Sequence, residues 1–138
     1  MKSIYKIFFI ALIALITDIP YLSYTRNKFM NMIYRVQGGQ SLNYRFMYLI
    51  PIYILIAIAI YITIFSKNKT DKEYDTKEII MRSFLMGVCV YGIYDFTNYT
   101  VFTNWDFNFI FQDMLWGGIL FTIVSLISSK LFKLKYFS

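Results

Sequence analysis

Four stretches of the chain are long and apolar enough to cross a membrane, and this pattern constrains the fold more than any other feature. A spanning helix needs about 20 apolar residues, because the hydrocarbon layer is about 30 Å thick and each residue adds about 1.5 Å. The runs are apolar on every face, whereas strands of a membrane barrel alternate apolar and polar residues. We therefore predict an all-α integral membrane four-helix bundle, a single domain over 1–138 with spans near 4–24, 46–65, 83–102 and 107–129.

Charged residues are scarce and lie mostly between the spans. They make up 16% of the chain, against about a quarter in soluble domains. The net charge is +6, but basic residues that flank membrane spans are explained by anionic lipid headgroups, so we expect the lipid bilayer as a partner and no nucleic acid. The chain has no histidine and only one cysteine, Cys89, so it lacks the commonest metal ligand and any internal disulfide. No cofactor is predicted from these features.

The distribution of Lys and Arg predicts which ends of the spans face the cytoplasm. Ten of these residues lie near the N-terminus, in the second connection or near the C-terminus, all on one side of the predicted bundle. Four lie on the other side, in the first connection, which is predicted over 25–44, and at its end: Arg26, Lys28, Arg35 and Arg45. Because cytoplasmic segments carry the excess of basic residues, we predict that both termini are cytoplasmic.

Three aspartates lie inside the predicted spans. An ionised side chain at the centre of a spanning helix costs about 2.5–3.5 kcal/mol, so these acids must be shallow, paired, protonated or in contact with water. The first and third spans run outward and the fourth runs inward, which brings Asp18, Asp95 and Asp113 to one level in the outer half of the bundle. Arg45 precedes the second span at the same level. We therefore predict a small, outward-facing polar pocket.

Other residues share helical faces with these acids. Gly87, Tyr91 and Asp95 follow one another at intervals of four, and Asn98 comes three residues later. On the fourth span, Trp116 and Gly117 lie on the same face as Asp113. Tyr91, Asn98 and Trp116 are therefore predicted to line the pocket, and Gly87 and Gly117 to permit close packing of helices.

The segment YGIYDFTNYTVFTNWDFNFIFQDMLWGG resembles the signature of the DUF2177 family of predicted four-span membrane proteins of unknown function. The signature has a Tyr-Asp-x-Thr-Asn element, a tryptophan about seven residues later and an Asp-x-x-Trp-Gly element. Its positions here are Tyr94, Asp95, Thr97, Asn98, Trp105, Asp113, Trp116 and Gly117. The first span resembles the family more loosely, with Tyr21 in place of a tryptophan three residues after Asp18. The resemblance implies four spans, an uncleaved first span, and pocket roles for Tyr94 and Thr97, but no activity.

Three functions fit this pocket. The first is a binding or transport component for a proton, a cation or a small polar solute; transport would need a homo-oligomer or a membrane partner protein, because four helices enclose no wide path. The second is a structural or partner-binding subunit without chemistry, in which the acids pair with Arg45, Asn98 and backbone groups to fix the helix register.

The third function is a membrane-embedded enzyme that acts on lipid. Two carboxyl groups with different environments can act as general acid and base. Against this function, the chain has no histidine, no HExxH-type metal motif and no nucleophile elbow, so the sequence leans against an enzyme. A carboxylate-only Mg²⁺ or Ca²⁺ site formed by Asp18, Asp95 and Asp113 is an open alternative, since these ions prefer oxygen ligands.

Overall fold

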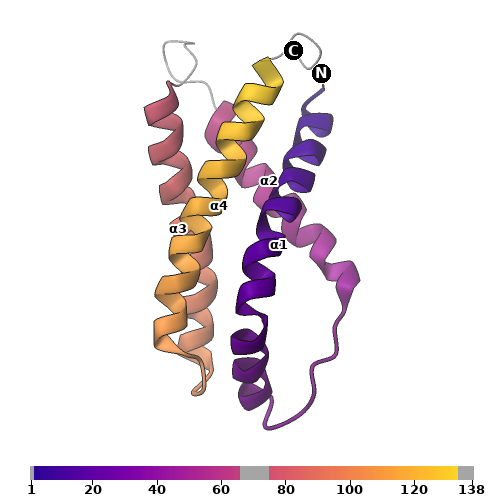
Figure 1. Cartoon of the computed structure of the whole chain (residues 1–138), viewed down its shortest axis with the longest axis vertical. Coiled ribbons are helices and arrows are strands. Elements are labelled where there is room, and N and C mark those ends of the chain that lie inside the picture. Colours follow the sequence, from indigo (N-terminus) through magenta and orange to yellow (C-terminus); the bar gives the residue numbers. More distant parts are fainter. Residues whose placement is uncertain (1, 66–74, 134–138) are drawn as a thin grey trace.

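The computed structural model describes residues 2–65 and 75–133, and these residues form an all-α bundle without a strand (Figure 1). The elements are α1 (Ser3–Val36), the short 3₁₀ helix η1 (Phe46–Tyr48), α2 (Leu49–Phe65), α3 (Thr76–Val101) and α4 (Phe107–Lys133). Each of four helical segments is long and apolar enough to span a membrane, η1 and α2 counting together as one. The predicted fold class, an all-α membrane helical bundle, is confirmed.

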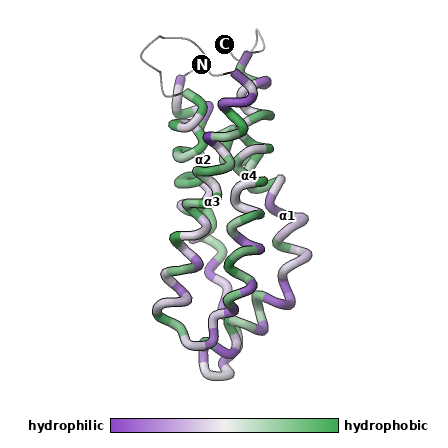
Figure 2. The backbone as a smooth tube through the Cα atoms, turned by 90° about the vertical axis from the view of Figure 1, so that its left-hand side faces the viewer, coloured by the Kyte–Doolittle hydropathy of each residue, from purple (hydrophilic) through white to green (hydrophobic). Residues whose placement is uncertain are grey.

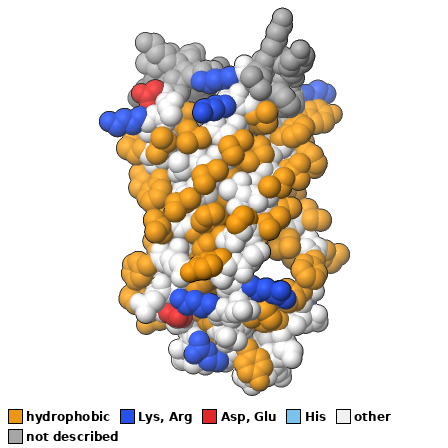
Figure 3. Space-filling model, in the orientation of Figure 1, with side chains coloured by type: hydrophobic (Ala, Val, Ile, Leu, Met, Phe, Trp, Pro, Cys, Tyr) orange, Lys and Arg blue, Asp and Glu red, His pale blue; other side chains and the backbone are white. Residues whose placement is uncertain are grey.

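The two ends of the bundle differ in what they carry. The start of α1, the end of α2, the start of α3 and the end of α4 lie at one end, which we call the termini end (Figure 1). The end of α1 and the α3–α4 turn lie at the other, which we call the hairpin end. A broad hydrophobic band separates Lys and Arg side chains near the two ends (Figure 3), as expected for a protein whose middle lies in hydrocarbon.

Helix α1 is longer than predicted. The first span was expected to end near residue 24, but α1 continues to Val36, so Arg26, Lys28 and Arg35 lie on a helix rather than in a loop. The extension is helical because it has an apolar face: Phe29 and Met32 pack in a second core with Trp105, Phe109 and Ile110. The helix ends where Gly38 and Gly39 adopt φ values of 65° and 86°, a conformation that glycine tolerates best.

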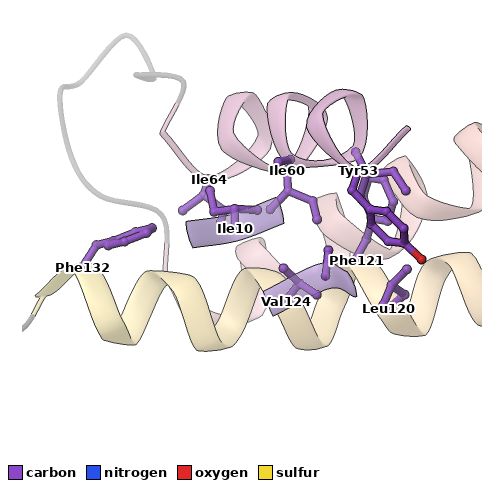
Figure 4. Packing of buried hydrophobic residues seen from close by; sticks show 11 residues of the cluster. Ile10, Tyr53, Ile60, Ile64, Leu120, Phe121, Val124 and Phe132 are labelled. Carbon is purple, nitrogen blue, oxygen red and sulfur yellow. The ribbon is translucent and has the colours of Figure 1, made fainter. Parts of the chain in front are cut away.

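Helix α2 covers only part of the bundle. In Figure 1 it begins level with the middle of α1, crosses behind α1 and α4, and ends at the termini end. There its side chains join the main core with residues of α1 and α4, among them Ile10, Ile60 and Val124 (Figure 4). The hairpin-end half of the bundle therefore consists mainly of α1, α3 and α4. In that half, hydrophilic positions recur along the helices (Figure 2).

Helices α3 and α4 form a tight antiparallel pair. A Cβ atom added to Gly87 would clash with the carbonyl oxygen of Gly117, and would lie 2.9 Å from the Cα of Gly118. Ser83, Ser125 and Ser128 are fully buried, as expected where small residues let helix backbones approach. Gly87 and Gly117, the glycines expected to permit close packing, thus face each other across this contact.

The turn between α3 and α4 is fixed by Asp106. Its Oδ1 accepts hydrogen bonds from the backbone N–H groups of Asn108 and Phe109, at 2.8 and 3.2 Å, which satisfies free donors at the start of α4. Its Oδ2 lies 3.9 Å from the Nζ of Lys28. This acid therefore joins the turn to the extended part of α1.

Candidate functional site

The carboxyl groups of Asp18, Asp95 and Asp113 lie together inside the bundle, although they come from α1, α3 and α4. Their exposed fractions are 5%, 0% and 8%. Asp113 is close enough to interact electrostatically with both of the others. We call these three residues the carboxyl cluster. The structure thus brings together three acids that the alternating directions of the spans had predicted to lie at one level.

Asp18 is held by two other helices. The hydroxyl of Tyr53, on α2, donates to Oδ2 of Asp18 at 2.7 Å. The indole Nε1–H of Trp116, on α4, donates to Oδ1 at 2.7 Å. Both carboxyl oxygens of this acid are therefore engaged by neutral donors, and α1, α2 and α4 are linked through a single side chain.

Asp113 is held by Tyr21 on α1. The Tyr21 hydroxyl donates to Oδ1 of Asp113 at 2.8 Å. The ring of Tyr21 stacks on Trp116, with 4.7 Å between the ring centroids and 9° between the planes. Stacked aromatic rings of this kind position each other, so the donor to Asp113 and the donor to Asp18 form one rigid unit.

Asp95 is the most deeply buried of the three acids and the least satisfied. Its Oδ1 accepts a hydrogen bond from the indole of Trp105 at 3.2 Å. Its Oδ2 is buried and accepts no hydrogen bond from the described residues. The carboxyl groups of Asp95 and Asp113 are close enough to interact. Two carboxyls can hydrogen-bond to each other only if a proton lies between them. The pair therefore retains the capacity to hold a proton or a donor group.

Among the residues that the structure describes, no basic side chain pairs with the carboxyl cluster. Within residues 2–65 and 75–133, the ion pair is between Lys28 and Asp106, and none of the three clustered acids pairs with a lysine or arginine. The pairing with Arg45 that the purely structural alternative assumed is absent from the described residues. Arg45 lies in the segment before η1 and is exposed, because α2 begins only at Leu49. Buried acids without such a partner are costly in the ionised form, which favours protonation or contact with other polar groups.

A cleft of about 640 Å³ reaches the cluster from the side where α1 faces the start of α2. Asp18 and Asp113 lie in its wall together with Tyr21, Tyr91 and Tyr94. Most of its remaining wall is apolar, and two arginines, Arg26 and Arg45, also line it. Figure 3 shows a hollow beside Lys and Arg side chains on the corresponding side of the molecule. Asp18 and Asp113 therefore border a space large enough for a molecule of moderate size.

The remaining predicted pocket residues differ in how they relate to the cleft. Five of them lie in its wall: Asp18, Arg45, Tyr91, Tyr94 and Asp113. Asp95 and Trp116 belong to the hydrogen-bond network behind this wall. Asn98 is half-buried beside Tyr94, and Thr97 is exposed on α3; neither contributes a hydrogen bond to the carboxyl cluster. Thr97 does not face the pocket because it lies two residues from Asp95, on another side of the helix.

Sequence reasoning missed several residues of the site. Tyr53 and Trp105 donate to the cluster, Tyr21 was noted only for its place in the family pattern, and Arg26 was assigned to a loop. The spacing of Tyr21 three residues after Asp18 was a usable signal for a shared helical face. Nothing in the second span marked Tyr53 as facing an acid, because tyrosine is also common at membrane interfaces.

The described residues provide no cluster of three His, Cys, Asp or Glu side chains placed to hold a metal ion. The oxygens of Asp18 are already occupied by the hydrogen bonds from Tyr53 and Trp116. A divalent ion takes six or more oxygen ligands, or an octahedral set with several waters. The described residues therefore give no support to the Mg²⁺ or Ca²⁺ site that the sequence left open, and that alternative stays a prediction.

Residues 3–130 match the family model described as predicted membrane protein (DUF2177). No curated protein and no solved structure matches the chain. The matched segment includes all four helices up to the last turn of α4, the carboxyl cluster and every residue that donates to it. The chain therefore belongs to the DUF2177 family of predicted membrane proteins.

Proposed function

We propose that this protein binds a small polar solute, one that carries a positive charge or a proton donor, at the carboxyl cluster. The observation that carries the proposal is the combination of three buried carboxyls with no basic partner among the described residues. An acid that served only to fix the helix register would be expected to have its oxygens engaged by protein donors, as Asp18 has, whereas Asp95 and Asp113 keep unused acceptor capacity. Intramembrane acids with such capacity mark binding sites and proton paths.

The three acids divide into two roles. Asp18 has both oxygens engaged by protein donors and acts mainly as a structural link between helices. Asp95 and Asp113 retain acceptor capacity, because one oxygen of Asp95 is unpartnered and Asp113 has a single protein donor. Asp113 also lies in the cleft wall, so it is the residue that a ligand would meet first.

The size of the cleft favours a solute over a bare proton. Sites for small molecules measure about 300–1,000 Å³ and are mostly apolar, with a few polar groups that fix orientation. The cleft of about 640 Å³, with acids in an otherwise largely apolar wall, has this character. We also propose, from the distribution of Lys and Arg, that the termini end is cytoplasmic and that the cleft lies in the outer half of the bundle. Transport by such a protein would require a second copy or a partner.

Ligand-dependent unfolding of the purified protein tests the proposal. Small amines such as methylammonium are expected to raise the unfolding temperature in a saturable way, because a ligand that binds only the folded state stabilises it; the gain is about 2.7 kcal/mol at one hundred times Kd. Asp113→Asn and Asp95→Asn are expected to lose this stabilisation.

The matched control is Asp106→Asn, which removes an acid at the hairpin end but keeps an acceptor for the start of α4. It is expected to respond to amines as the wild type does. The proposal fails if the wild type shows no saturable response, or if Asp113→Asn and Asp95→Asn respond as strongly as Asp106→Asn.

A further inference from the structure

We infer that the ligand of the cleft is the headgroup of a membrane phospholipid that carries a primary amine. In this arrangement the phosphate lies against Arg26 and Arg45, the ammonium group lies against Asp113, and the acyl chains stay in the bilayer. The inference rests on the proposed function, because it names the class of molecule that supplies the positive charge.

The rim of the cleft faces lipid. Ile19, Leu22, Phe46 and Leu49 line the cleft, and each is also exposed at the surface of the bundle. They come from α1 on one side and from η1 and α2 on the other. In a membrane these side chains contact hydrocarbon, so the opening admits a molecule sideways from the bilayer. A site for a water-soluble ion needs no such apolar rim.

The two arginines of the cleft suit a phosphate group. Arg26 and Arg45 come from different elements, both line the cleft, and no described acid forms an ion pair with either. The planar guanidinium group presents paired N–H donors that match phosphate oxygens. Lys28, nearby on α1, is engaged by Asp106 at 3.9 Å and lies 5.5 Å above the ring of Phe109. Arg26 and Arg45 are therefore the basic residues of the cleft that can bind an anionic group.

The acids of the cleft suit the other end of such a headgroup. Asp18 and Arg26 are eight residues apart on α1, so they differ in level by about 12 Å along the helix. The long arginine side chain can cover part of this separation by lying along the cleft wall. Each charge of a zwitterionic headgroup can then lie beside a group of opposite charge: the phosphate beside the arginines and the ammonium beside Asp113. The buried, unpartnered Oδ2 of Asp95 adds an acceptor behind Asp113.

The number of N–H groups on the amine decides between lipids. A primary ammonium donates three hydrogen bonds, whereas a quaternary ammonium has the same charge and donates none. A carboxylate that accepts charge-assisted hydrogen bonds therefore prefers ethanolamine to choline, and a headgroup without an amine gains nothing at Asp113. This preference is the property that distinguishes the proposed ligand from phospholipids in general.

The test is a lipid titration of the full-length protein in detergent, followed by native mass spectrometry. The probes are dioleoyl phosphatidylethanolamine, its N-methyl and N,N-dimethyl derivatives, and phosphatidylcholine with the same chains. We expect the apparent Kd to weaken along this series by about tenfold in total, the worth of one charge-assisted hydrogen bond. Arg26→Gln and Arg45→Gln should weaken all four lipids, while Asp113→Asn should abolish the differences among them. Arg35→Gln, an exposed arginine on α1 outside the cleft, should change nothing.

Three outcomes would overturn the inference. Equal affinities along the series would show that the amine is not recognised, and unchanged binding by both arginine variants would show that the phosphate is not held there. Binding of soluble phosphoethanolamine as tightly as the lipid would assign the site to a free solute. If small amines still stabilise the wild type and not Asp113→Asn, the proposed function stands and only the lipid is wrong; if Asp113→Asn changes neither response, both fail.

Discussion

Replacing Gly87 with valine is expected to destabilise the bundle by about 3 kcal/mol or more, the upper end of the range for overpacked interiors. A Cβ atom at this position would lie 2.5 Å from the carbonyl carbon of Gly117 and 2.9 Å from the Cα of Gly118. These neighbours are backbone atoms, so no side-chain rotation can relieve the overlap and α3 must move away from α4. The loss would appear as a lower unfolding temperature in detergent.

The matched control for this change is Gly92→Ala, on the same helix. A Cβ atom there would meet only the flexible end of Met114, with the closest atom, Cε, at 3.1 Å. Methionine adapts readily to new neighbours, so we expect a change within about 1 kcal/mol. If Gly87→Val proves as stable as Gly92→Ala, the close contact between the two backbones does not exist.

Replacing Asp18 with leucine is expected to have the second large effect. The change removes the acceptor for the Tyr53 hydroxyl and for the Trp116 indole, and leaves both donors facing an apolar side chain. Interhelical hydrogen bonds in membranes contribute about 1–2 kcal/mol each in model peptides, so the loss should be about 2–4 kcal/mol. In the unfolded reference state α1 is already inserted in the bilayer, where a leucine side chain is more stable than an aspartate. The measured loss of stability therefore reports the weaker association of the helices.

Asp18→Asn provides a graded comparison. The amide keeps one acceptor oxygen but turns a donor toward the other partner, so its stability should fall between wild type and Asp18→Leu. Chemical unfolding in the same detergent would rank the three proteins. A leucine variant at least as stable as the wild type would mean that Asp18 does not link α1 to α2 and α4.

The fold and the central acids were predictable because each depends on a strong and simple signal. Twenty apolar residues in a row have few alternatives to a spanning helix. The alternating directions of the spans then determine the level of every residue along the membrane normal. Asp18, Asp95 and Asp113 were found in this way, since acids in hydrocarbon are expensive wherever they lack a polar neighbour.

The hydrogen-bond donors were not predictable, because they depend on how the helices rotate and tilt against one another. Tyr53 reaches Asp18 only because α2 begins beside the middle of α1 and crosses it obliquely (Figure 1). Trp105 lies in the turn between α3 and α4, and its indole reaches back along α3 to donate to Asp95. The structural alternative paired Arg45 with the acids, but Arg45 precedes α2 in an exposed segment and lines the cleft without an ion pair to them. Periodicity gives the face of one helix and does not say which neighbour that face meets.

The extended end of α1 was missed for a related reason. Its polar residues, Arg26 and Lys28 among them, suggested a loop in water. The apolar residues between them share one helical face that packs on Trp105 and Phe109. Amphipathic helices outside the hydrocarbon layer have the composition of loops, and only their periodicity distinguishes them.

A double-mutant cycle between Asp95 and Asp113 tests most directly whether the carboxyl groups of these two acids interact in one cluster. The measurements are the unfolding free energies of wild type, Asp95→Asn, Asp113→Asn and the double variant, in one detergent and without added ligand. Neutralising either acid removes the same interaction, so the account predicts that the two effects are not additive and differ from their sum by more than about 0.5 kcal/mol. Effects that add within about 0.3 kcal/mol would show that the two carboxyls do not interact, and would contradict the account.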